Sequence, residues 1–172
     1  MPAALSVIRD EHRSLVAVLQ ALQFLVRDIR DRGVEPDFDL FSLILDYIEI
    51  FPEKLHHPKE DDYLFKAVRT RTAEANAVLD ELEREHARCD ELIHSLRHAL
   101  ARYRVGGAQG FEAFAAAVDD YLDFHWKHMR KEEDVVIPLA ERVLTDSDWT
   151  TIDAAFKAND DPLFGPQPKQ EF

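Results

Sequence analysis

The sequence predicts an all-α fold: an antiparallel up-down four-helix bundle with a pseudo-twofold repeat, followed by a short C-terminal helix and tail. Five glycines in 172 residues are too few for the turns of a sheet protein or for phosphate-binding loops. Sparse breaks separate four long segments, at about 3–31, 38–68, 72–104 and 110–144. Their apolar residues recur at steps of three and four, the period of an amphipathic helix. We therefore expect residues 1–145 to form the bundle and 146–172 to form the helix and tail packed on it.

Each segment carries its own stripe of apolar residues along one helix face. The first runs from Leu5 to Ile29, and the break around Gly33 ends it. The third and fourth are regular and meet at the glycines of 106–110. The second is rougher because Pro52 and Pro58 each remove a backbone donor, so we expect a kink there or a helix in two pieces. Residues 148–156 are expected to form the short fifth helix.

Composition excludes several classes of protein. Thirty-four acidic residues against 21 basic ones give a net charge of −13, which disfavours nucleic-acid binding and docking on an anionic membrane. No apolar run is long enough to span a membrane, and early charges such as Arg9 do not fit a signal peptide. A single cysteine, Cys89, excludes a disulfide framework. We expect a cytoplasmic protein with no nucleic-acid or membrane partner, and exposed aliphatic positions leave room for a homodimer.

The helical stripes contain ionisable residues where leucine or valine belongs. Burying such a group is costly unless it is paired or bound to a metal. One buried histidine would need no special account, but several require a common explanation. These residues are His12, His56, Glu60, His86, His125, His128 and Glu132.

The chain also repeats itself. The sequence RDEH at 9–12 resembles EREH at 83–86, and the two lone histidines are 74 residues apart. The sequence HHPKEDD at 56–62 resembles HMRKEED at 128–134, with an offset of 72. The odd-numbered helices therefore each supply one histidine, and the even-numbered helices each supply one HxxxE pair.

This arrangement predicts a metal site. Residues four apart share a helix face, so each HxxxE pair can aim an imidazole and a carboxylate at one point. Two metals that share both carboxylates would satisfy all six groups. Imidazole and carboxylate suit iron, zinc or manganese, and we favour two non-haem iron ions in a bridged di-iron centre because zinc cannot exchange electrons with a ligand such as dioxygen. The predicted metal ligands are His12, His56, Glu60, His86, His128 and Glu132.

Other residues near these positions keep more than one interpretation. His57 points about 100° away from its neighbour and is a surface residue, a hydrogen-bond donor to the ligands or an extra ligand. His125 is an extra ligand, a donor or a core histidine, and Cys89 is a small core residue or a functional thiol. His94 and His98 do not lie on the apolar stripe of the third segment, so we expect them to be exposed to solvent. A solvated acidic face is expected from Asp61, Asp62, Glu133 and Asp134.

The joint pattern resembles the haemerythrin-like (HHE cation-binding) domain family over roughly residues 5–143. The resemblance rests on His12, HHPKEDDYLF from 56 to 65, His86 and HMRKEEDVVIP from 128 to 138. It implies a four-helix bundle around a non-haem di-iron centre. Oxygen-carrying members have a second histidine one turn after the lone histidine of the third helix, where this chain has Asp90. Their last carboxylate is typically an aspartate in an HxxxxD spacing.

The resemblance implies that the protein binds iron and a small ligand, namely dioxygen, nitric oxide or peroxide, in sensing or stress response. One alternative is a di-iron enzyme acting on peroxide, oxygen or nitric oxide. Another is an iron-handling or iron–sulfur-cluster repair protein, although the repair proteins carry an N-terminal cysteine-bearing segment that we do not find here. The sequence leaves open whether the protein is an enzyme, and it identifies no catalytic residue.

Overall fold

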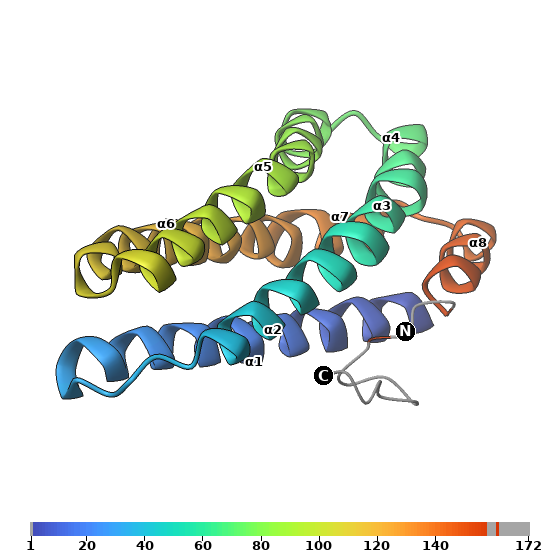
Figure 1. The fold of residues 1–172 in the computed structure, drawn as a ribbon. Helices are drawn as coiled ribbons and strands as arrows, with labels where there is room; N and C mark the ends of the chain where they lie inside the picture. The colour runs from blue at the N-terminus through green and yellow to red at the C-terminus, as the bar shows by residue number, and fades with distance from the viewer. Residues whose placement is uncertain (1, 158–160, 162–172) are drawn as a thin grey trace.

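The computed structural model describes residues 2–157 and 161, and all regular secondary structure among these residues is helical (Figure 1). No helix among them combines the length and apolar character needed to cross a membrane. Residues 158–160 and 162–172 of the expected tail lie outside the described part. The elements in chain order are α1 (Ala3–Arg32), α2 (Phe38–Ile48), η1 (Glu49–His56), α3 (His57–Lys59), η2 (Glu60–Phe65), α4 (Lys66–Arg71), α5 (Asn76–Gly106), α6 (Ala108–Lys131), η3 (Glu132–Val136), α7 (Ile137–Val143) and α8 (Asp146–Phe156).

The long helices pack together as a helical bundle (Figure 1). Helix α1 contacts α2 and α6, while α5 contacts α2 and α6 from the other side. Gly33, with a φ of 64°, ends α1, and Asp37 caps the start of α2 by accepting hydrogen bonds from two backbone amides. Gly107, with a φ of 57°, separates α5 from α6. Helix α8 packs against α1 and η2, where Trp149 and Ile152 are buried.

Three of the elements are π-helical, with backbone hydrogen bonds that span one residue more than in an α-helix. Segment η1 contains Pro52, which has no N–H to donate. Segments η2 and η3 begin at Glu60 and Glu132, at corresponding places of the sequence repeat. The expected kink or break in the second segment is thus a continuous helical stretch with two π-helical insertions. Such turns re-aim the side chains around them and occur often at functional sites.

Two apolar clusters form the core of the described part of the chain, and the predicted metal ligands lie between them on every long helical stretch. On α1, for example, Ile8 belongs to one cluster, Leu15 to the other, and His12 lies between. On α6 and η3, Tyr121 belongs to one cluster and Val136 to the other, and His128 lies between them in the sequence. The bundle therefore has one buried polar layer with an apolar core above and below it.

Gly110, near the start of α6, lies close to the backbone of Tyr103, near the end of α5. A Cβ atom there would lie 2.6 Å from the Cα of Tyr103, and the backbone cannot move away cheaply. We expect Gly110→Ala to lower the free energy of unfolding by about 1–3 kcal/mol, despite the better helix propensity of alanine. Urea unfolding measures this. Gly106→Ala is the matched control because a Cβ there meets nothing within 4 Å, and an equal effect at both positions would contradict the close approach.

Candidate metal centre

Six buried or nearly buried side chains meet in the polar layer, and they are the six that the sequence predicts as metal ligands. His12 comes from α1 and His86 from α5. The two HxxxE pairs come from the second and fourth helical stretches, with each glutamate opening a π-helical segment. Their side chains are 1–7% exposed, for His12, His56, Glu60, His86, His128 and Glu132.

These side chains form two groups. In the first half-site, the Nε2 atoms of His12 and His56 are 3.3 Å apart. Oε1 of Glu60 lies 3.3 Å from His56 Nε2, and Oε2 of Glu132 lies 3.4 Å from His12 Nε2. Two ligands that bind one metal ion at about 2.1 Å in cis positions are roughly 3 Å apart, so these spacings fit a shared cation.

The second half-site repeats the arrangement. The Nε2 atoms of His86 and His128 are 3.0 Å apart. Oε1 of Glu132 lies 3.0 Å from His128 Nε2, and Oε2 of Glu60 lies 3.7 Å from His86 Nε2. Each glutamate therefore presents one oxygen to each half-site.

The four carboxylate oxygens of Glu60 and Glu132 are buried and have no hydrogen-bond partner among the described residues. Leaving two acceptor-only groups buried in this way is expensive unless a cation satisfies them. Nitrogen and oxygen donors without thiolate suit zinc, iron or manganese. The residues therefore fit a pair of such ions.

A second layer of acids holds the histidines, and we call it the carboxylate ring. Each Nδ1 atom faces a carboxylate oxygen of a neighbouring helix at 2.6–2.9 Å. Such contacts orient an imidazole and increase its basicity toward a metal. These partners were not predicted from the sequence. Asp61 and Glu133 do lie at a partly solvated face, with 32% and 34% of their side chains exposed, but each also contacts a histidine, and Asp62 and Asp134 are exposed. The pairs are Glu133 with His12, Glu11 with His56, Asp61 with His86 and Glu85 with His128.

A family model described as the hemerythrin HHE cation binding domain matches residues 3–140. The chain belongs to this family. The match extends over all six converging side chains and confirms the resemblance drawn from the sequence. Comparisons with curated proteins and with solved structures returned no match.

In the HHE domain without metal, the buried charges of the site balance one another. Burial disfavours the charged form of His86, but contacts with Asp61 and Glu132 outweigh it and raise its pKa to about 9. Burial likewise opposes the charge on His128, yet Glu132 and Glu85 raise that pKa to about 10. Burial alone would raise the pKa of Glu132, but its histidine neighbours hold that pKa well below the usual range. Protonated histidines thus supply the positive charge that a bound cation would otherwise supply.

This balance predicts opposite pH dependences for stability and for metal affinity. A raised histidine pKa stabilises the folded state fully below the ordinary value of about 6.5, and this contribution is lost as the pH rises through about 9 and 10. The metal-free domain should therefore lose stability from about pH 7 to pH 10, while Zn²⁺ affinity increases because fewer protons compete. Urea midpoints and proton release on Zn²⁺ addition in weak buffer measure both. The stability loss should be smaller in His128→Gln, and equal losses in both proteins would contradict this account.

The other histidines of the HHE domain fall into distinct places. His57 is 4% exposed, so the surface interpretation is wrong for it. His125 is fully buried against the Tyr121 ring, with centroids 4.4 Å apart, and neither of its nitrogens has a hydrogen-bond partner among the described residues. Burial lowers the pKa of His125 to about 3, which keeps its imidazole neutral. Cys89 is buried as well.

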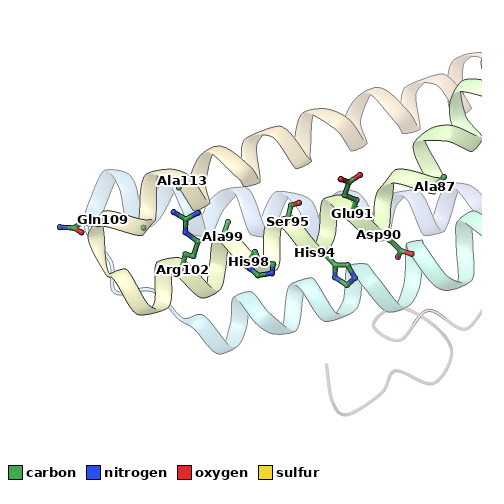
Figure 2. A pocket seen from close by; sticks show the side chains of 11 residues that line it. Ala87, Asp90, Glu91, His94, Ser95, His98, Ala99, Arg102, Gln109 and Ala113 are labelled. Carbon is green, nitrogen blue, oxygen red and sulfur yellow. The ribbon is translucent and has the colours of Figure 1, made fainter.

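His94 and His98 are exposed, as expected from the sequence. With Asp90 they line an open groove of about 840 Å³ beside α5 and α6 (Figure 2). None of the six converging side chains lines it. The position that is a histidine in oxygen-carrying members therefore faces outward here as Asp90.

Proposed function

We propose that this protein binds two iron ions through His12, His56, Glu60, His86, His128 and Glu132, with both glutamates bridging. The observation that carries the proposal is the division of the six side chains into two half-sites, each with two Nε2 atoms and one oxygen from each glutamate. Membership of a cation-binding family agrees with it. We also propose that the bundle is an antiparallel up-down arrangement of four helices with pseudo-twofold symmetry, because the half-sites repeat one another.

We further propose that the iron pair binds dioxygen, nitric oxide or peroxide in sensing or stress response in the cytoplasm. An iron pair supplies two electrons for exchange with such a ligand. The chain's own contribution is to exclude bulk water with the apolar clusters on either side and to fix the imidazoles through the carboxylate ring. Access is supported by an open groove that includes His12, Met129 and Glu133 in its lining. The ring of Phe156, from α8, packs edge-on to His56 with centroids 6.2 Å apart.

The decisive experiment is metal analysis of the purified protein together with its visible absorption spectrum. We expect two irons per chain and the charge-transfer bands of an oxo-bridged pair. Exposure of the reduced sample to oxygen, nitric oxide and peroxide in turn should give a reversible spectral change with at least one of them. A protein that takes up no iron would overturn the proposal. Continuous consumption of peroxide or nitric oxide above that of free iron would instead show an enzyme.

A further inference from the structure

Lys131 is the last residue of α6 and stands directly before Glu132. Its Nζ atom donates a hydrogen bond to Oε1 of Glu85 and another, at 2.6 Å, to Oε1 of Glu81, both on α5. The other oxygen of Glu85, Oε2, lies 2.9 Å from Nδ1 of His128. One member of the carboxylate ring therefore connects a lysine to a proposed metal ligand.

The sequence repeat carries the same three residue types in the other half. Both HxxxE pairs read HxxKE, so Lys59 holds the place of Lys131. Glu11 likewise holds the place of Glu85, and its Oε2 atom lies 2.6 Å from Nδ1 of His56. Burial lowers the pKa of Lys59, and the negative charge of Glu11 opposes this shift, so the two charges interact. A lysine and a glutamate behind the histidine of each pair are therefore a feature of the repeat.

The side chains of Lys131, Glu85 and His128 lead from the surface into the second half-site. They are 24%, 17% and 1% exposed, in that order. Charges interact more strongly where water is excluded, so the charge on Lys131 acts on His128 with less screening than that of a fully exposed lysine. Lys127, one turn earlier on α6, is 68% exposed and pairs with Asp123, which is not a member of the carboxylate ring. It offers the same charge without the connection.

We propose that Lys131 is a positioning residue that raises the reduction potential of the iron in the second half-site through Glu85 and His128. The inference rests on the proposed iron pair. A carboxylate at Nδ1 makes an imidazole a stronger electron donor, and a stronger donor favours the ferric ion. Lys131 draws the charge of Glu85 toward Oε1, away from His128, and so weakens that donation. Its own positive charge favours the less charged ferrous ion as well.

The test is a redox titration of the full chain loaded with iron, followed by visible absorption. We expect Lys131→Met to shift the ferrous-to-ferric ratio of one iron about tenfold toward ferric at a fixed potential, which corresponds to about 59 mV for one electron. Lys131→Arg keeps the charge and should titrate as the unaltered protein. Lys127→Met is the matched control, because it removes the same charge from an exposed position on the same helix, and its shift should be much smaller.

A further variant separates this role from a purely structural tie between α5 and α6. Glu81→Gln weakens the other hydrogen bond of Lys131 and leaves the connection through Glu85 in place. It should not lower the potential. If Glu81→Gln or Lys127→Met lowers the potential as much as Lys131→Met does, the inference is overturned.

The outcomes also distinguish this inference from the proposed iron pair. If the unaltered chain takes up no pair of irons, the proposed function fails and this inference fails with it. If the chain takes up the pair and Lys131→Met titrates as the unaltered protein does, only the role of Lys131 is overturned. Circular dichroism checks that each variant folds. Should Lys131→Met not fold, Lys131→Gln takes its place with the same expected shift.

Discussion

Glu132→Gln is expected to reduce the iron content from two ions per chain to less than one. Glu132 presents one oxygen to His12 at 3.4 Å and the other to His128 at 3.0 Å, so both half-sites depend on it. Glutamine keeps the shape but loses the negative charge and one of the two acceptors. A ligand that binds only the folded state stabilises it by about 2.7 kcal/mol at a hundred times its dissociation constant. The variant should therefore also lose the rise in Tm that metal produces in the unaltered protein.

The comparison requires Tm with and without metal for each protein, because the substitution also alters the metal-free charge balance. Glu91→Gln is the matched control, since Glu91 is exposed on α5 and is not one of the six converging side chains. It should keep both ions and the full metal-dependent rise. A Glu132→Gln variant that retained two irons and the same rise would contradict the assignment of bridging ligands.

The helices were predictable because each buries one continuous stripe of apolar residues. The expected first segment, 3–31, compares with Ala3–Arg32, and the fourth, 110–144, compares with Ala108–Lys131 continued by η3 and α7. The π-helical segments were not predictable, since an extra residue in a helical turn leaves no compositional mark. Pro52 signalled an irregularity in η1, but η2 and its counterpart η3 contain no proline. A site that needs its glutamates re-aimed accounts for both better than proline does.

The convergence of the six side chains was predictable because the same residue types occur twice at nearly the same spacing. Their partners were not recognised, although the repeat carries them too. Glu11 and Glu85 each precede a lone histidine, and Asp61 and Glu133 each follow the glutamate of an HxxxE pair. Acidic residues at helix surfaces are usually solvated, so composition alone does not reveal these contacts. Only the crossing of neighbouring helices brings each acid to an imidazole of another helix.

Because each acid contacts a histidine of one half-site only, the carboxylate ring can be tested separately in each half-site. Asp61 contacts His86 in the second half-site at 2.8 Å, and Glu133 contacts His12 in the first at 2.8 Å. Asp61→Asn and Glu133→Gln keep the side-chain shape but remove the charge that makes each imidazole a stronger donor. We expect each variant to weaken one of the two bound ions by about 10–100-fold, measured by competition with a chelator.

The double variant decides whether the ring acts locally or only through overall charge. Substitutions at separate sites without shared partners add in free energy, so both ions should weaken in the double variant, each as in its single variant. Asp62→Asn and Asp134→Asn remove the same charge one residue further along, where the side chains are exposed. If these controls weaken binding as much as the ring variants do, the effect is general electrostatics. If they leave both ions bound as before, contact with the histidine Nδ1 atoms is what matters, and the two halves of the chain hold their metals by the same device.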